Sequence, residues 1–441
     1  MINRLKQLWS DKFVRGTFIL TGTGFLGSVF NYLVHPIVSR NLSVAAYGDF
    51  QALLSFISVF GIIGAVIYTS LTKEISTLAA GNFAVITALR RRAVLWLSVA
   101  GLILFLLVLV FSGPLHSLFN ISQTGLLIIS SLILLYTYPL IVNRATLAGL
   151  QHFSVLSALN LSDPTFRLLL VVLLVSVWSW GIIGAAWALG LTSLVGLGLS
   201  FWAVRRLNLG KGSASFNYPW TAIGRYALLV LWFTALAQFF YNFDMLFIKS
   251  AFSPEEAGLY GALLTVGRII FFVGGAVPLV MFPVIAGLRA DPSARRLFVL
   301  LKSLGLMSLL TVPAGVVIAL WPGFMIRIVV GVKYLAVAPY LPLFALAMLL
   351  LTLLTVLSQY FLALSRRRGL IVLTVAAFVE ALLLALFHAD FWQVIWVIVV
   401  VYGLADLVLV GLLVWEYRQL KRGELAGKLG SELEPLKTEI L

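Results

Sequence analysis

Twelve long apolar segments, separated by short connections, account for nearly the whole of this 441-residue sequence. A helix needs about 20 mostly apolar residues to cross roughly 30 Å of hydrocarbon. The composition agrees, because 61% of the residues are hydrophobic, 11% are charged and the mean hydropathy is +1.07. These values exclude a water-soluble globular protein, in which the apolar share is about half. The sequence therefore predicts an all-α integral membrane protein with twelve transmembrane helices.

The expected spans share an apolar stretch bounded by polar or charged residues. Their approximate limits are 16–39, 47–72, 93–112, 124–143, 153–177, 181–204, 225–248, 258–287, 303–322, 337–364, 369–387 and 391–415.

Cationic side chains are distributed unevenly between the two sets of connections. The termini and the even-numbered connections hold 25 of the 31 Lys and Arg residues, including the arginine run 366–368. The odd-numbered connections hold only Arg40, Lys249, Arg327 and Lys333. Because cytoplasmic loops carry the excess of Lys and Arg, the crowded side is expected to be cytoplasmic. The sequence thus predicts a multi-pass protein of the cytoplasmic membrane with both termini in the cytoplasm.

The net charge of +15 is explained mainly by this topology. The cations are scattered over separate cytoplasmic segments, which argues against a nucleic-acid partner. The absence of cysteine excludes disulfides and thiolate metal sites. No phosphate-binding Gly-Lys-Ser loop, metal-ligand cluster or nucleophile elbow is found, so neither a metal nor ATP hydrolysis is expected.

An internal repeat divides the chain. The segment Ser43–Leu53 aligns with Ser253–Leu263 at an offset of 210 residues, with serine, glycine, an aromatic residue and Ala-Leu in common. The offset places the start of span 2 on the start of span 8, which predicts two pseudo-symmetric six-helix lobes of the same orientation. The expected division is an N-lobe over 1–206, a cytoplasmic linker over 207–224, a C-lobe over 225–416 and a polar cytoplasmic tail over 417–441.

Three passages carry a family resemblance: Arg40–Phe50, Leu147–Phe153 and Asp244–Tyr260. In order and spacing they resemble the polysaccharide transporter family, the O-antigen-type flippases of the multidrug/oligosaccharidyl-lipid/polysaccharide exporter (MOP) superfamily. The resemblance implies a V-shaped exporter fold whose two lobes surround a cavity that opens to either side in turn. It also implies a transporter, not an enzyme, that moves the headgroup of a lipid-linked oligosaccharide.

Several alternatives remain open at this point. Lipid II flippases generally carry two further C-terminal spans, whereas only a polar tail follows Trp415. Drug exporters of the same superfamily bind organic cations and gain nothing from arginines in the cavity. A glycan polymerase or ligase needs a large outer loop with an acid/base pair, but the longest outer connection, 322–336, holds only Arg327 and Lys333 as ionisable residues. A non-transporting scaffold is disfavoured by the charges within the spans.

Two cations lie inside the expected spans, and both are candidates for binding substrate. Arg167 and Arg268 each lie about ten residues from the outer end of their span, so they share a depth. In the implied architecture they converge on the cavity, where the planar guanidinium groups suit a pyrophosphate. The alternative is that Asp163, four residues before Arg167, and Asp244 of span 7 neutralise the two arginines and pin the helices.

Two carboxylates of the C-lobe, Glu380 and Asp406, also share a depth within spans 11 and 12. Neighbouring acids in a low dielectric do not both ionise cheaply, so the pair predicts a bound proton or cation. Coupling to a proton or sodium gradient is therefore expected, with no other cofactor. The partners that the resemblance implies are a lipid-linked oligosaccharide, the membrane lipids and a glycan polymerase or glycosyltransferase complex.

Overall fold

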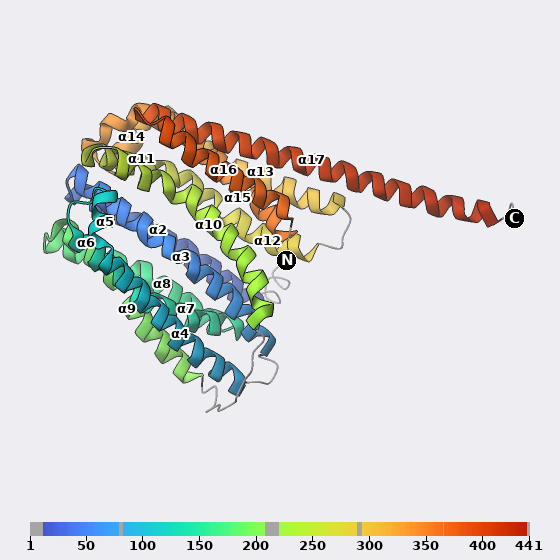
Figure 1. The fold of residues 1–441 in the computed structure, drawn as a ribbon, viewed down its shortest axis with the longest axis horizontal. Coiled ribbons are helices and arrows are strands. Elements are labelled where there is room, and N and C mark those ends of the chain that lie inside the picture. Colours follow the sequence, from blue (N-terminus) through green and yellow to red (C-terminus); the bar gives the residue numbers. More distant parts are fainter. Residues whose placement is uncertain (1–11, 79–82, 208–219, 289–292, 365, 439–441) are drawn as a thin grey trace, which may run out of the picture. The chain divides into compact units, whose positions relative to one another are not determined.

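The computed structural model of the protein describes residues 12–78, 83–207, 220–288, 293–364 and 366–438. Within these ranges every regular element is a helix (Figure 1). The elements are α2 (Lys12–Asn41), α3 (Val44–Leu78), α4 (Phe83–Val110), α5 (Ser112–Leu118), α6 (Thr124–Ser131), α7 (Leu134–Gly149), α8 (Phe153–Val171), η1 (Val172–Val177), α9 (Gly181–Arg206), α10 (Trp220–Ala251), α11 (Pro254–Gly274), α12 (Ala276–Gly287), α13 (Ser293–Leu320), α14 (Pro322–Val329), η2 (Val332–Tyr340), α15 (Leu341–Ala363), α16 (Arg367–Leu386) and α17 (Phe391–Thr438).

Each expected span coincides with one helix or with two consecutive helices. Eleven helical segments of the described residues are long and apolar enough to cross a membrane. The remaining expected span, 16–39, falls within the 30-residue helix α2. The spans made of two consecutive elements are the fourth (α6 and α7), the fifth (α8 and η1), the eighth (α11 and α12) and the tenth (η2 and α15).

Backbone irregularities accompany some of these divisions. Gly275 separates α11 from α12, and a Cβ atom on the adjacent Gly274 would lie 2.5 Å from Cγ2 of Thr352. The π-helix η1 ends the fifth span, and a tight turn follows in which Ser179 and Gly181 have φ angles of +56° and +59°. Only glycine adopts such a φ without strain, so Gly181 fits the start of α9.

Large apolar side chains are exposed on many helices, in contrast to a soluble protein. The tryptophans at the expected span ends follow the same pattern, because Trp178, Trp180, Trp202, Trp321 and Trp415 are all exposed. Such rings lie at the interface between lipid and water in membrane proteins. The surface is therefore suited to lipid as its solvent.

The helices pack into two compact units. The first comprises residues 1–265 together with 326–337, and the second comprises 266–325 and 338–441. This grouping places α10 and the first part of α11 with the helices of the first sequence half. The expected lobes follow the sequence repeat instead, and their boundary stays a prediction. Most of the expected linker, 207–224, lies outside the described residues.

In the first unit, α3 packs against both α7 and α10, while α2 packs along α8. The core between α3, α4 and α7 is apolar and includes Leu71, Ile75, Leu89 and Val142. Burial of such side chains contributes about 1.5–3 kcal/mol each. These contacts hold α3 in place between helices from both halves of the sequence.

In the second unit, α15 packs against α12, α13, α16 and α17. Helix α17 runs from Phe391 to Thr438, well beyond residue 415, where the last span was expected to end. The expected polar tail is therefore helical over most of its length. Glu380 and Asp406 lie on the neighbouring helices α16 and α17.

Candidate functional site

Arg167 lies on α8, which packs along α2. The side chain is partly buried, and its Nη1 donates a hydrogen bond to Oδ1 of Asn31 over 3.2 Å. Its Nε is buried and has no hydrogen-bond partner among the described residues. A neutral amide does not compensate the charge of a guanidinium group. Asp163, one turn earlier on α8, also interacts electrostatically with Arg167. The unpaired Nε nevertheless leaves hydrogen-bonding capacity for an anion.

Asp163 pairs with a different arginine. Its Oδ2 lies 3.1 Å from Nη2 of Arg144 on α7, and the hydroxyl of Ser193 donates to the same oxygen over 3.3 Å. Arg144 also donates to the carbonyl of Leu159 over 2.7 Å. Arg144, counted with the cations of a cytoplasmic connection, lies on the last part of α7 and holds the carboxylate that was the alternative partner for Arg167.

Arg268 and Asp244 belong to different compact units. Arg268 is partly buried in the second half of α11, in the second unit. Asp244 of α10 is 3% exposed and belongs to the first unit; its Oδ1 accepts the N–H of Met245 and its Oδ2 accepts the hydroxyl of Tyr260 over 3.1 Å. An Asp244–Arg268 pair, and the convergence of Arg268 with Arg167, stay predictions.

The two carboxyl groups of the second unit are deeply buried, with exposed fractions of 0% for Glu380 and 4% for Asp406. The hydroxyl of Tyr402 lies 3.5 Å from Oε1 of Glu380. Asp406 follows Tyr402 by one turn of α17, so both lie on the same face of that helix. Neither carboxylate oxygen of Asp406 has a hydrogen-bond partner among the described residues. The two acids thus lie on neighbouring helices, as the expected ion site requires. The ion site itself stays a prediction.

Asp49 and Lys249 form a buried ion pair that joins α3 to α10. Nζ of Lys249 lies 2.7 Å from Oδ1 of Asp49, and the two side chains are 1% and 3% exposed. The second oxygen of Asp49 accepts the N–H of Ser122 over 3.2 Å. Both charges sit near the expected outer ends of their helices. The pair therefore fastens span 2 to span 7 at that end.

A polar cluster around Tyr47 and Gln51, two residues to either side of Asp49 on α3, continues this connection. The hydroxyl groups of Tyr47 and Thr265 lie 2.6 Å apart, and Nε2 of Gln51 donates to Thr265 Oγ1 and to the carbonyl of Gly261 over 2.6 Å and 3.0 Å. His35 of α2 lies 3.3 Å from the Tyr47 hydroxyl. Because buried polar groups gain from mutual hydrogen bonds, the cluster joins α2, α3 and α11. We call this cluster and the Asp49–Lys249 pair the outer joint.

The C-terminal end of α2 contacts the first part of η2, residues 332–337, which belongs to the same compact unit. Nζ of Lys333 donates to the carbonyls of Leu42 and Arg40, and the hydroxyl of Tyr334 donates to that of Ser39 over 3.2 Å. These carbonyls lack partners within the helix, and a cation there also interacts favourably with the helix dipole. The segment thus extends the outer joint.

Two glycines allow the helices of the outer joint to approach closely. A Cβ atom on Gly48 of α3 would lie 2.7 Å from the backbone nitrogen of Gly258 on α11. Gly48 and Gly258 are equated by the 210-residue repeat, as are Gln51 and Gly261, which also touch. Contacts between equivalent residues are expected next to a two-fold axis. The repeat therefore coincides with the joint.

The sequence analysis missed Asp49 and Lys249. Lys249 was counted with an outer connection, whereas it lies in the last turn of α10 and is buried against Asp49. A signal was present, since Asp49 interrupts the apolar stretch expected as span 2 and Lys249 follows span 7 by one residue. A charge inside a span calls for a partner of opposite sign.

The sequence model of the polysaccharide biosynthesis protein family matches residues 13–289, more than half of the chain. The chain belongs to this family. Among curated proteins, none matches the sequence.

Solved structures of membrane transporters share the fold of this chain. An inward-facing multidrug resistance MATE family transporter of the MOP superfamily has a TM-score of 0.75 at 13% identity, over 90% of this chain and 96% of that chain. The lipid II flippase MurJ, in an inward closed conformation, has a TM-score of 0.67 at 14% identity, over 91% and 87%. An outward-facing multidrug resistance MATE family transporter has a TM-score of 0.61 at 17% identity, over 94% of this chain and 98% of that chain. The predicted exporter fold is confirmed.

Removing one charge of the buried pair should destabilise this polysaccharide biosynthesis protein. We expect Lys249→Met to lower the free energy of unfolding by about 3–5 kcal/mol, because it leaves Asp49 buried without its counter-ion. Unfolding in detergent would measure the loss. The double variant Asp49→Asn with Lys249→Met should recover most of it.

The control is the longer ion pair of Arg366 and Glu416, whose atoms lie 4.0 Å apart and whose arginine side chain is 46% exposed. Arg366→Gln should cost no more than about 1 kcal/mol. Equal losses for Lys249→Met and Arg366→Gln would contradict the role given to the buried pair.

Proposed function

We propose that this polysaccharide biosynthesis protein is a flippase that carries a polyprenyl-linked oligosaccharide across the cytoplasmic membrane by alternating access. The proposal rests on the family membership over residues 13–289. A family concerned with glycan synthesis, combined with a fold shared with a lipid flippase, supports a glycan attached to a lipid as cargo. Membrane lipids and a glycan polymerase or glycosyltransferase complex are the further partners proposed.

Arg167 is proposed as a ligand of the phosphate groups that link glycan and lipid. Its charge lies within a span, where an ionisable group is costly and is usually retained for function. The pairing of Asp163 with Arg144 supports this role, because the nearest acid in sequence is already engaged. Arg268 is proposed as the corresponding ligand from the second sequence half, with Asp163 and Asp244 as the acids that hold the surrounding helices.

The outer joint is proposed as the gate that closes the substrate path at the expected outer side of the membrane. It links α2 and α3 of the first sequence half with α10, α11 and η2 of the second. Alternating access requires such a link to form and break in each cycle. Hydrogen bonds and an ion pair suit this task, because each group can be satisfied by water once the gate opens.

Glu380 and Asp406 are proposed as the site at which an ion gradient drives the cycle. Two buried carboxyl groups on adjacent helices can exchange protons or hold a cation. Within the described residues no group of three or more acidic or histidine side chains forms a metal site. A site with one or two carboxyl groups is compatible with a proton or with Na⁺.

A second candidate is export of a small molecule or drug, because multidrug transporters share the fold. Arg167 argues against an organic cation as substrate, since like charges repel. Uptake of a fluorescent organic cation into proteoliposomes that contain the protein distinguishes drug export from oligosaccharide translocation. Transport of that cation with no movement of a lipid-linked oligosaccharide would favour the drug exporter.

Replacing Arg167 should slow translocation. We expect Arg167→Ala to lower the rate at which a fluorescent lipid-linked oligosaccharide crosses proteoliposome membranes by at least about tenfold, since charge-assisted hydrogen bonds contribute about 1.5–3 kcal/mol. Arg167→Lys should give an intermediate rate, because the charge remains and the planar fork is lost.

Arg327→Ala is the matched control, because Arg327 is exposed in an expected outer connection. Its rate should equal that of the unmodified protein. Normal translocation by a variant that lacks both Arg167 and Arg268, at equal protein levels, would eliminate the proposed phosphate ligands.

Neutralising Asp406 should uncouple transport from the driving ion. In proteoliposomes with an imposed proton or sodium gradient, Asp406→Asn should abolish the acceleration that the gradient gives to the unmodified protein. Without a gradient, the variant should translocate substrate at the rate of the unmodified protein, because Asp406 is not proposed to contact the substrate. Flux through the unmodified protein that responds to neither gradient would refute ion coupling.

A further inference from the structure

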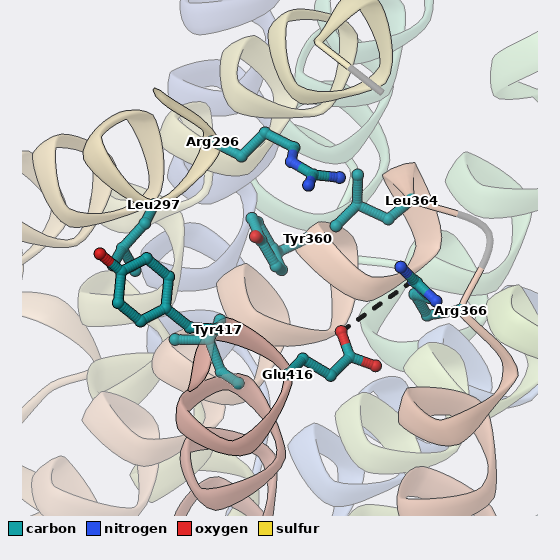
Figure 2. Close-up of a pocket in the computed structure, with 8 residues that line it drawn as sticks. Arg296, Leu297, Tyr360, Leu364, Arg366, Glu416 and Tyr417 are labelled. Atoms are coloured by element: carbon teal, nitrogen blue, oxygen red, sulfur yellow. Dashed lines mark ion pairs between the residues drawn. The ribbon is translucent and has the colours of Figure 1, made fainter. Parts of the chain in front are cut away.

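A pocket in the second unit lies outside the proposed substrate path. It is formed by the first turn of α13, the C-terminal end of α15 and the middle of α17, on the arginine-rich side. Its cavity volume is roughly 20 Å³, and it is partly open to solvent; Figure 2 shows the residues that line it. Arg296, Tyr360, Arg366, Glu416 and Tyr417 contribute its polar side chains. All of these residues belong to one compact unit.

Cations exceed anions in this pocket. Arg296 of α13 is only 8% exposed, and its Nε is buried without a hydrogen-bond partner among the described residues. Arg366 lies across the pocket, where its Nε is 4.0 Å from Oε2 of Glu416, as Figure 2 shows. Arg368 reaches the other oxygen of Glu416 over 3.8 Å. Arg366 and Arg368 thus share one carboxylate, and Arg296 adds a third guanidinium group nearby.

Glu416, the acidic residue that lines this pocket, makes only long ion pairs with the arginines. Both ion pairs of Glu416 are near the longest distance for such pairs, and its Oε1 has no hydrogen-bond partner among the described residues. A buried guanidinium group with an unused donor is costly unless an anion or water satisfies it. The pocket is therefore built for more negative charge than the chain supplies.

The pocket lies at the depth where lipid headgroups are expected. Trp415, which directly precedes Glu416, is 45% exposed, and the guanidinium of Arg368 lies 4.5 Å above its ring. Exposed tryptophans mark the interface between hydrocarbon and headgroups. Basic pockets between helices at this level suit phosphate-containing lipid headgroups.

We propose that this pocket binds a phosphate group of the membrane interface, with Arg296 and Arg366 as its ligands and Glu416 as a competing internal anion. The phosphate of an anionic phospholipid headgroup is the proposed source. Tyr360 also lines the pocket, between Arg296 and Glu416 in Figure 2, and its hydroxyl group can donate a further hydrogen bond. The site is independent of the proposed flippase activity, because none of its residues is placed on the transported substrate.

Thermal unfolding of the full chain in neutral detergent, followed by tryptophan fluorescence, tests the proposal. Titration with phosphatidylglycerol should raise the unfolding temperature in a saturable way, whereas phosphatidylcholine should have little effect. Inorganic pyrophosphate serves as the water-soluble probe. A saturable effect of pyrophosphate alone would contradict the lipid headgroup as the source.

Variants identify the pocket as the site. Arg296→Gln should raise the apparent Kd for phosphatidylglycerol about tenfold or more, because a charge-assisted hydrogen bond is lost. Arg418→Gln, which removes an exposed cation two residues beyond Glu416, should leave the Kd unchanged.

Glu416→Gln changes binding in the opposite direction. Removal of the competing carboxylate should lower the Kd several-fold, and a folding defect would not mimic that gain. The proposal is overturned if phosphatidylglycerol gives no saturable stabilisation, or if Arg296→Gln and Glu416→Gln bind it as the unmodified protein does.

Discussion

The buried ion pair between Asp49 and Lys249 is the interaction on which the expected outer end of the first unit depends. Lipid offers no water to compensate a charge, so each of these residues requires the other. The pair fixes α3 against α10, and this placement allows Gly48 to meet Gly258 and Gln51 to reach Gly261 and Thr265. Two halves of the sequence are thereby joined by polar contacts that a hydrated state could release.

The same constraint separates the arginines of the first unit into two kinds. Arg144 is compensated by Asp163 and holds α7 to α8, so its role is structural. Arg167 donates its side-chain hydrogen bond to the neutral Asn31, and Asp163, one turn earlier on α8, balances its charge only in part because it is paired with Arg144. In a MOP exporter fold this difference supports Arg167 as a ligand for anionic cargo. Glu380 and Asp406, buried in the other unit, would then supply the driving ion.

Hydropathy and charge were sufficient to predict the twelve helices, because the lipid solvent imposes both the length and the apolar character of each span. The same patterns could not predict the partners of individual charges. Asp163 contacts Arg144, nineteen residues earlier in the chain, and Lys249 contacts Asp49 across the sequence repeat. Such pairs depend on how helices face one another, which a hydropathy profile does not contain. The internal repeat contains more of this information, because Gly48 and Gly258, which it aligns, are in contact.

A disulfide across the outer joint would test most directly whether the joint is a gate. A Cβ atom at Gly261 would lie 3.4 Å from Cβ of Gln51, close to the separation of a disulfide, and the chain has no cysteine of its own. Oxidation of a variant with Gln51→Cys and Gly261→Cys should stop translocation of a lipid-linked oligosaccharide in proteoliposomes. Reduction should restore the rate to that of the two single variants. Cross-linked protein that translocates as fast as its reduced form would contradict the account.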